Sequence, residues 1–596
     1  MPGDHPTLAV SRFEGRTLPA LLARTAARLP GKVFLHHLDP AAPAAPPRLL
    51  TFEAFRRQVA RATSFLRSAG TGPGDRVLLL AENSPAWQAF ALAAQHLRAE
   101  PAALFASLAP EAAQETARRV RPRVAVVSSG EQWEKLAPTA AELAAAGLRA
   151  VVSGTALDPG ALPGGLRAAT VAETTGEGAP TLTPAELDAL AGAVGEEDPF
   201  LLLFTSGTSG RPKGVRLPQR AIVHAIDGGG PATAATEADL GLHFLPFAHV
   251  AGHDQFALAL AQGHGLVMFS RREDLERGLA LSPTYLFSVP LVYERLRTAA
   301  EARIQALPAP VRALVRAALR AAGRVRVDGA GRAGDRVLSR LADASVGRAL
   351  RARLGGRVRA LFSGGAPASP ALFRFFEALG LPFVELYGMS ETAGLISSNR
   401  FAGPRRPGSA GLPTPDHELR LDADGELLLR GPLLLSGYLD PEDAAAFTED
   451  GWFRTGDLVH READGTLRVE GRKKDLLVLS TGKKVSPGPI EQAIACAPPF
   501  QGAVLLGEGR AFVAAAVFVG REELDRLAAA GLEAGEALLE RARAALGAFS
   551  DYEKPKRLLV IPGAPHEHPA LVTPTLKLRR ASVIASLGPE VARLYS

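Results

Sequence analysis

One stretch of the sequence combines glycines, hydroxylated residues and a lysine in the manner of a phosphate-binding loop. Residues 205–214 read TSGTSGRPKG and follow the apolar run Phe200–Phe204, which predicts a short buried strand. Glycines let backbone N–H groups turn toward an anion, hydroxyls add donors, and Lys213 adds a positive charge. The stretch departs from the common P-loop, because Pro212 stands in place of glycine and Gly214 in place of Ser or Thr. A mobile surface loop is the alternative interpretation.

Two further segments carry groups suited to a nucleotide and a metal ion. SGGAP at residues 363–367 follows an expected strand, and its glycines would let a flat ligand approach the backbone. ELYGMSET at residues 385–392 lies at another strand end, the usual ligand edge of an open α/β sheet. There Tyr387 offers a ring for stacking and Glu391 a carboxylate suited to Mg²⁺. Each segment alone is more often structural than functional.

A third pair of segments is suited to a sugar. GWFRTGD at residues 451–457 ends on Asp457, and GRKKD at residues 471–475 contains Arg472. An aspartate can accept hydrogen bonds from both hydroxyls of a ribose, and an arginine beside it adds donors and charge. Short motifs of this kind also arise for structural reasons, so neither decides the function alone.

Taken together, the motifs resemble those of the adenylate-forming superfamily, which includes acyl-CoA synthetases, luciferases and peptide-synthetase adenylation domains. TSGTSGRPKG, SGGAP, YGMSET, GWFRTGD, GRKKD and the C-terminal TPTLKLRR occur in the order and approximate spacing of that family. The resemblance covers nearly the whole chain. It implies a two-step reaction, in which a carboxylate attacks the α-phosphate of ATP, releasing pyrophosphate, and the acyl-adenylate then passes its acyl group to a thiol. Positioned amides, a lysine and Mg²⁺ can stabilise the charge of the first step.

The resemblance also implies a role for individual residues. Thr205 and Glu391 would lie near the metal ion, and Asp457 with Arg472 would hold the ribose. The implied catalytic residues are Lys577, Lys213, Glu391, Thr205 and His249. The implied nucleotide-binding residues are Thr205, Ser206, Gly207, Thr208, Ser209, Gly210, Lys213, Gly365, Ala366, Pro367, Tyr387, Gly388, Met389, Ser390, Asp457, Arg472 and Lys577.

A moving C-terminal domain is a further implication of the resemblance. In the family this domain turns near the residue that corresponds to Lys474 and removes a catalytic lysine, here Lys577, after adenylation. Rotation then brings the face of residues 482–487 toward the incoming thiol. The alternative for Lys577 is an exposed lysine in a terminal tail.

The acyl group implied by subfamily features is a fatty acid. LPFAH at residues 245–249 resembles the LPLAH segment of long-chain acyl-CoA synthetases, where the histidine or a nearby aromatic guards the acyl tunnel, and SVPLVYER at residues 288–295 also resembles that group. A tunnel gains roughly 0.8 kcal/mol per buried methylene, so it needs an apolar lining more than specific contacts. No aspartate is clearly placed to recognise an α-amino group, which disfavours an amino acid.

Two positions depart from the long-chain pattern. Gly252 stands where that group usually has glutamate, with His253 and Asp254 following, and Lys483-Lys484 replaces the usual Glu-Asn of the thiol-facing loop. The lysines would alter CoA binding, favour another acceptor or assist the CoA phosphates.

Three functions therefore stay open. The first is an ATP-dependent long-chain fatty acid:CoA ligase, and the second is a fatty acyl-AMP ligase that loads an acyl carrier protein. The third is a non-catalytic adenylate-binding protein, which the intact Lys213, Glu391, Asp457 and Lys577 disfavour.

The elements that must position these motifs are predicted from hydrophobic periodicity. Helical spacing at residues 51–67 and 85–97 alternates with apolar strands at 76–80 and 123–128, which indicates parallel sheets covered by helices. Short alternating strands with Asp424-Gly425 and Asp464-Gly465 turns indicate an antiparallel β subdomain.

Beyond Asp475 a small α+β domain is expected, including one long helix at residues 522–546. We therefore predict an α/β fold with a large N-terminal domain, residues 1–473. It holds two α/β sheet subdomains and the antiparallel β subdomain. A small mobile α+β C-terminal domain, residues 474–596, completes the prediction.

Composition places the chain among soluble globular proteins of more than one domain. It has 596 residues, 47% hydrophobic and 22% charged, and neither a basic leader nor an apolar run of transmembrane length is found, so a cytoplasmic protein is expected. The single cysteine, Cys496, excludes an intramolecular disulfide and is expected to be buried or half-buried.

Charge is concentrated in one region. Residues Arg295–Arg359 hold 16 arginines, no lysine and four acids, a net charge of +12, against −6 for the rest of the chain. Arginines recur every fourth residue from Arg312 to Arg324 on an expected amphipathic helix. This face would attract a membrane surface, an acidic carrier protein or phosphates. The alternative is a solvated helix face, and no aromatic pattern suggests nucleic acid.

Overall fold

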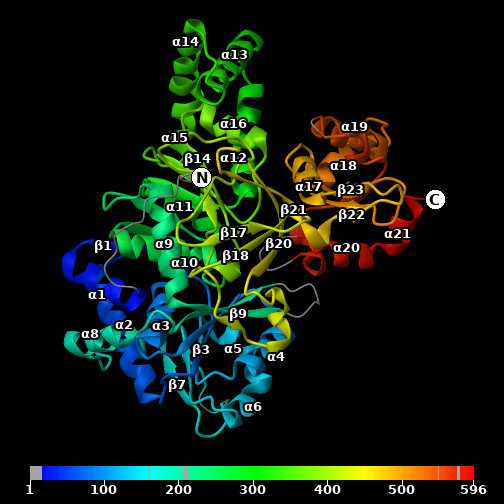
Figure 1. Cartoon of the computed structure of the whole chain (residues 1–596). Helices are drawn as coiled ribbons and strands as arrows, with labels where there is room; N and C mark the ends of the chain where they lie inside the picture. The colour runs from blue at the N-terminus through cyan, green and yellow to red at the C-terminus, as the bar shows by residue number, and fades with distance from the viewer. Residues whose placement is uncertain are drawn as a thin grey trace.

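Two α/β sheets, an antiparallel β subdomain and a small C-terminal domain make up the chain (Figure 1). The structure is a computed structural model and describes residues 17–158, 160, 162–205, 212–547, 549–572 and 578–595. Within these residues, 21 α-helices and 26 strands are assigned. The predicted fold class is confirmed.

The first sheet carries the expected phosphate-binding segment. Its eight strands follow the order β19-β9-β8-β4-β3-β5-β6-β7, in which the pairs from β8 to β7 are parallel, while β9 is antiparallel to both β8 and β19. The strands are β3 (Arg76–Leu80), β4 (Glu100–Leu104), β5 (Val124–Val127), β6 (Ala150–Ser153), β7 (Arg167–Thr170), β8 (Pro199–Thr205), β9 (Lys213–Pro218) and β19 (Gly437–Tyr438). Thr205 ends β8 and Lys213 begins β9, so the two residues are paired across the hairpin.

The second sheet carries the expected adenine-binding segments. Its nine strands follow the order β16-β15-β14-β13-β12-β10-β11-β1-β2. They are β1 (Val33–His37), β2 (Arg48–Thr51), β10 (Leu240–His243), β11 (Gly265–Met268), β12 (Tyr285–Ser288), β13 (Ala360–Ser363), β14 (Phe383–Tyr387), β15 (Ser397–Ser398) and β16 (Leu412–Pro413). Strands β10 to β14 are parallel, so the segments after β13 and β14 leave the sheet at the same edge.

Helices cover both sheets and form a shared core between them. Phe34 of β1, Phe200 of β8, Phe55 of α2, Phe90 of α3 and Phe256 of α10 are all fully buried in one hydrophobic cluster. The N-terminal helices are α1 (Leu18–Arg28), α2 (Phe52–Ser68), α3 (Pro85–His96), α4 (Pro110–Val120), α5 (Gly130–Glu134), α6 (Ala140–Ala145), α7 (Val171–Thr175), α8 (Pro184–Ala193), α9 (Gln219–Thr233), α10 (Val250–Gln262), α11 (Leu275–Ala280) and α16 (Pro370–Ala378). Burial of this cluster fixes the two sheets relative to each other.

The arginine-rich region forms a helical projection (Figure 1). It contains α12 (Pro290–Gln305), α13 (Ala309–Arg326), α14 (Ala333–Ala342), a π-helical turn at Asp343–Gly347 and α15 (Arg348–Arg353). The expected amphipathic helix is α13, in which Val315 and Ala318 are buried. Val311 and Leu314, which the sequence places on the same side, remain 44% and 49% exposed.

The antiparallel subdomain consists of four strands in the order β17-β18-β20-β21. They are β17 (Glu418–Leu421), β18 (Glu426–Arg430), β20 (Phe453–Arg461) and β21 (Leu467–Arg472). The expected turns at Asp424-Gly425 and Asp464-Gly465 join β17 to β18 and β20 to β21, with both glycines at positive φ.

The C-terminal domain has two small sheets covered by helices. Its elements are β22 (Leu477–Val478), β23 (Lys484–Val485), α17 (Pro487–Ala495), β24 (Phe500–Leu506), β25 (Ala514–Val519), α18 (Arg521–Ala529), α19 (Ala534–Ala545), β26 (Leu558–Pro562), α20 (Arg580–Ser586) and α21 (Gly588–Arg593). The prediction of a single helix at residues 522–546 is wrong. Gly531, at a φ of 68°, ends α18 and lets a separate α19 begin.

Candidate active site

A buried carboxylate lies where three motifs meet. Asp457 of β20 is 4% exposed and accepts a hydrogen bond from the Tyr387 hydroxyl at 2.7 Å. Arg472, its partner across β20 and β21, places Nε 2.7 Å from the other carboxylate oxygen. Burial raises the pKa of Asp457 although Arg472 and Tyr387 act in the opposite direction. The arrangement fixes a carboxylate that can accept further hydrogen bonds from hydroxyls of a ligand.

The phosphate side of the site is built on the β8–β9 hairpin. Lys213 Nζ lies 3.0 Å from Asp443 Oδ1 and 5.4 Å from the centre of the Tyr438 ring, so its position is fixed from two sides. Thr205 is half-buried opposite it. The predicted phosphate ligands Ser206, Gly207, Thr208, Ser209 and Gly210 lie outside the described residues.

The unusual glycine at the end of the phosphate-binding segment has a packing reason. A β-carbon on Gly214 would lie 2.6 Å from Leu439 Cβ and 3.3 Å from Leu202 Cδ1. Strand β9 therefore has no room here for the Ser or Thr of the common P-loop.

Glu391 interacts electrostatically with residues of both the expected phosphate site and the expected ribose site. It lies in a 3₁₀ turn, Ser390–Thr392, whose Thr392 hydroxyl donates to the Met389 carbonyl at 3.0 Å. Burial raises the pKa of Glu391, while the charges of Arg472 and Lys213 lower it. These opposing influences show that the carboxylate lies within electrostatic reach of both cations.

Close backbone contacts hold the Glu391 segment in place. A β-carbon on Gly388 would lie 1.6 Å from the Gly394 carbonyl oxygen and 3.0 Å from Leu395 Cα. All the nearest atoms are backbone, so no side-chain movement can make room. Gly388 is thus required for the turn that returns the chain past its own strand.

The expected adenine-binding residues form an open edge beside an unexpected acid. Gly365, Ala366 and Pro367 follow β13 and are exposed, with Gly365 at a φ of 80°. Beneath them, Glu385 Oε1 accepts the Ala368 N–H at 3.2 Å.

The second oxygen of this acid is buried without a partner. Among the described residues, no group reaches Glu385 Oε2, and burial raises the pKa of the carboxyl to about 8. Sequence reasoning missed Glu385, although an acid inside an apolar strand was the available signal. At neutral pH it is mostly protonated and can donate or accept a hydrogen bond.

Polar side chains also line the region predicted to hold the acyl group. His249 caps α10, its Nδ1 accepting the Ala251 N–H at 3.2 Å. His253 Nε2 lies 2.7 Å from the Phe247 carbonyl oxygen, and burial lowers the pKa of His253 to about 3, so the ring is neutral. His253 is thus held in a structural role, whereas the function predicted for His249 stays a prediction.

The departures at Gly252 and Asp254 have different causes. A β-carbon on Gly252 would lie 2.6 Å from the Pro246 carbonyl oxygen, so the glutamate usual in the long-chain group does not fit. Asp254 faces Gly394, since a β-carbon there would lie 1.9 Å from Asp254 Oδ2. Its Oδ1 is buried without a hydrogen-bond partner in the described part of the chain, and burial raises the pKa well above the usual range.

The expected hinge lies two residues beyond Arg472, one of the expected ribose-binding residues. Lys474 occupies a 3₁₀ turn, Lys473–Asp475, directly after β21. Partial burial, followed by the charges of Arg472 and Lys213, lowers the pKa of Lys474. The predicted catalytic residue Lys577 lies outside the described residues.

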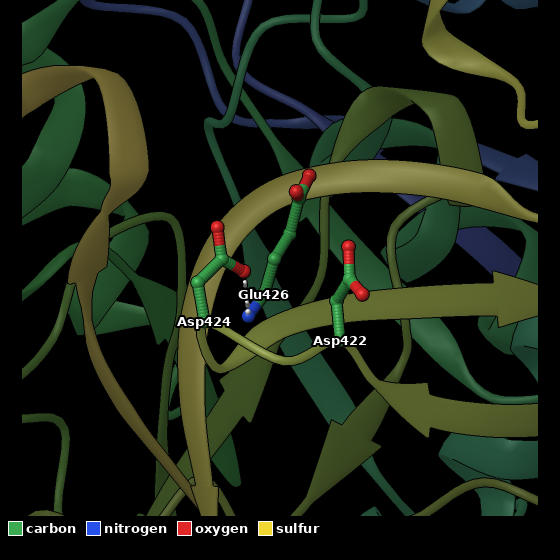
Figure 2. Close-up of side chains that lie close together, drawn as sticks. All are labelled: Asp422, Asp424 and Glu426. Carbon is green, nitrogen blue, oxygen red and sulfur yellow. Dashed lines mark hydrogen bonds between the residues drawn. The ribbon is translucent and has the colours of Figure 1, made fainter.

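The residue before Lys474 is tied to an acidic cluster. Figure 2 shows Asp422, Asp424 and Glu426, whose carboxylates come within 4.8 Å of one another. Lys473 Nζ lies 2.5 Å from Asp424 and 2.9 Å from Glu426, and Arg454 lies 3.1 Å from Asp422 and 3.0 Å from Glu426. Two protein cations therefore offset two of the three negative charges of the cluster, and the Lys473 contacts fix the N-terminal side of the turn.

The two lysines of the thiol-facing loop lie on the surface. Lys483 and Lys484 are both exposed, and Lys483 Nζ stands 4.3 Å from the centre of the Tyr552 ring. Cys496, as expected, is half-buried.

Comparison with known families matches almost the whole chain. The sequence profile described as AMP-binding enzyme matches residues 22–439, and the profile described as AMP-binding enzyme C-terminal domain matches residues 474–596.

Individual relatives agree with these matches. A long-chain-fatty-acid--CoA ligase, FadD15 of Mycobacterium bovis, is 32% identical over 70% of this chain and 73% of its own length. A chloroplastic long-chain-fatty-acid--[acyl-carrier-protein] ligase, AEE15 of Arabidopsis thaliana, is 25% identical over 68% of this chain and 62% of its own. Among solved structures, the A-PCP didomain of a carboxylic acid reductase from Segniliparus rugosus, in complex with AMP, has a TM-score of 0.74. The two sequences are 21% identical, and the structural match covers 98% of this chain and 82% of the reductase chain.

Proposed function

This chain belongs to the AMP-binding enzyme family, and on that premise we propose that it is an ATP-dependent long-chain fatty acid:CoA ligase. The reaction would pass through an acyl-adenylate, with release of pyrophosphate and then AMP. One observation carries the proposal: the buried Asp457 is held by Tyr387 and Arg472, which come from two other motifs, and Glu391 interacts electrostatically with both Arg472 and Lys213. Ribose, metal and phosphate groups of one nucleotide can be bound at such a site.

Each group would act by position and charge. Asp457 accepts the ribose hydroxyls, and Tyr387 stacks on the adenine beside Gly365, Ala366 and Pro367. Glu385, which the family resemblance did not supply, offers a neutral carboxyl toward the base edge.

On the phosphate side, Lys213 and the N–H groups of residues 205–210 hold the β and γ phosphates and stabilise the leaving pyrophosphate. Thr205 and Glu391 supply oxygen atoms, the ligands that Mg²⁺ prefers. When bound, the ion would neutralise phosphate charge. Lys213 is half-buried and already held between Asp443 and Tyr438, so little reordering is needed on binding.

The C-terminal domain supplies the second lysine in this proposal. We place the domain boundary between residues 473 and 474, with Lys474 as the hinge and Lys577 bridging the carboxylate and the α-phosphate. The Lys473 contacts with Asp424 and Glu426 support this boundary, because they fix the chain immediately before the proposed hinge. His249, at the start of α10, is proposed to guard the acyl tunnel.

The acceptor of the acyl group and the location of the enzyme in the cell are also proposed. CoA is the proposed thiol, and an acyl carrier protein is the alternative, since one relative is named for that acceptor. The exposed Lys483 and Lys484 suit the phosphates of CoA or an acidic carrier. Among the described residues, no helix has the length and apolar content needed to cross a bilayer. We propose a cytoplasmic enzyme that reaches a membrane surface through residues 295–359.

An acid panel tests the function directly. The purified chain is incubated with ATP, Mg²⁺ and saturated acids of increasing length, with CoA or a phosphopantetheinylated carrier as acceptor. We expect AMP release and CoA thioester only when ATP, a long-chain acid and CoA are all present. Thioester formation on the carrier alone would favour the alternative, and no adenylation of any acid would contradict both.

A further inference from the structure

The arginine-rich projection carries a positive charge that its own acids do not neutralise. Its four acids are each already paired with an arginine of the protein. The pairs are Glu301 with Arg297, Asp328 with Arg374, Asp335 with Arg324, and Asp343 with Arg326 and Arg351. Because 16 arginines face only four acids within residues 295–359, most of the positive charge of the projection is left over.

Exposed aliphatic side chains lie beside arginines on both α13 and α14, but two of the α13 arginines already donate to Gln305. On α14, Val337 is 65% exposed and Leu341 is 40% exposed, four residues apart on one side of the helix. Arg336 and Arg340 lie beside them, and Arg348 follows on α15; all three are exposed. We call these five residues the α14–α15 face.

The rest of the helix shows why this face is free. Ser339 and Ala342 are buried, and Ala342 packs in a small cluster with Ala318 and Ala322 of α13. The inner side of α14 is thus occupied, while no hydrogen bond or ion pair joins the side chains of Arg336, Arg340 or Arg348 to another described residue. Figure 1 shows α14 at the outer end of the projection, away from the first sheet.

We propose that the α14–α15 face docks the enzyme on the surface of an anionic phospholipid membrane. Guanidinium groups would bind lipid phosphates, often through two parallel hydrogen bonds, while Val337 and Leu341 enter the boundary between headgroups and acyl chains. This inference rests on the proposed function, because a long-chain acid is concentrated in membranes. An acidic carrier protein offers carboxylates but no apolar layer for two exposed aliphatic side chains, so the face fits a membrane better.

Binding to vesicles tests the inference. The full chain is sedimented with vesicles of phosphatidylcholine alone and with 30% phosphatidylglycerol. We expect partition into the anionic vesicles only, weakened by salt. The triple variant R336Q/R340Q/R348Q should lose at least about tenfold in partition, and V337S/L341S should also bind less while keeping its charge.

A matched control lies on the neighbouring helix. R312Q/R316Q/R320Q removes the same charge from α13, where Arg312 and Arg316 already donate to Gln305. It should retain most of the binding. An equal loss in both triple variants, or binding of the wild type to neutral vesicles, would overturn the inference.

Two further measurements distinguish a membrane site from a carrier-protein site and from a loss of activity. Ligase activity with a long-chain acid dissolved in a nonionic detergent, without vesicles, should be unchanged in R336Q/R340Q/R348Q, and inactivity of the wild type in this assay would count against the proposed function alone. If the same variant lost transfer to an acyl carrier protein and kept its vesicle binding, the face would be a carrier site and the membrane inference would fall.

Discussion

At the scale of single residues, the site depends on buried acids whose surroundings raise their pKa. Asp457 has two strong donors, whereas Glu385 has one backbone N–H and one unpartnered oxygen. Leaving a buried oxygen unpartnered costs stability, and a charge there costs more. We therefore propose that a hydrogen bond with a ligand satisfies the unpartnered oxygen of Glu385.

Glu385 makes the stability of the protein depend on pH in a defined direction. Its carboxyl has a pKa of about 8 in the folded protein and an ordinary value near 4.5 when exposed. Between these values the folded state holds a proton that the unfolded state has released, so the free energy of unfolding falls as pH rises. Glu385→Gln keeps the shape without the charge, so near pH 8 it should be more stable than the wild type by about 1–3 kcal/mol. In thermal melts near pH 5 the two proteins should behave alike; an equal difference at both pH values would contradict this.

Some residues of the candidate site could be predicted from the sequence, and others could not. Asp457, Arg472 and Tyr387 were selected from their motifs, and the structure brings them together, although their contact with a nucleotide stays a prediction. Glu385 was missed, because a charged residue in an apolar strand has no spacing rule. The contact between Asp254 and Gly394 joins residues 140 positions apart, which no local pattern reports.

At the scale of elements, glycines decide how closely the motif-bearing segments approach one another. Gly214, Gly252 and Gly388 each face backbone or side-chain atoms within 3 Å of where a β-carbon would lie. Gly214 and Gly252 explain the departures from the P-loop and from the long-chain pattern. Gly388 allows the turn that positions Glu391. The strands and capped helices around them follow hydrophobic periodicity and turn chemistry closely. The break between α18 and α19 was not predicted, since an isolated glycine in a helical pattern is often tolerated.

Gly388→Ala tests the turn that carries Glu391. The added methyl group would displace backbone at Gly394 and Leu395, so we expect a loss of about 2–4 kcal/mol in the free energy of unfolding. The KM for ATP should rise as well, because Glu391 would move. Gly229→Ala in α9 is the control: its β-carbon would meet only Leu395 Cδ2, at 3.8 Å, and it should be neutral or slightly stabilising. Equal effects of the two substitutions in chemical denaturation would refute the steric argument.

At the scale of the whole molecule, the proposed two-step reaction would bring two domains to the same substrate in turn. The α/β core, shared by both large sheets, gives a rigid base for the nucleotide site. The C-terminal domain has its own hydrophobic core, and the chain enters it directly after the Lys473 contacts. Fold class and the number of subdomains followed from the sequence, because alternating helices and strands indicate parallel sheets. The projecting helices and their exposed α14–α15 face did not follow, since periodicity alone does not tell which apolar residues lack a partner.

Substitution of Lys577 tests the central claim, that a lysine of the C-terminal domain serves adenylation alone. Lys577→Ala should lower ATP–pyrophosphate exchange with a long-chain acid by at least about 100-fold, because the charge that bridges the carboxylate and the α-phosphate is lost. The same variant, given synthetic acyl-adenylate and CoA, should form thioester at nearly the wild-type rate. Exchange at the wild-type rate, or equal loss of both half-reactions, would contradict this claim.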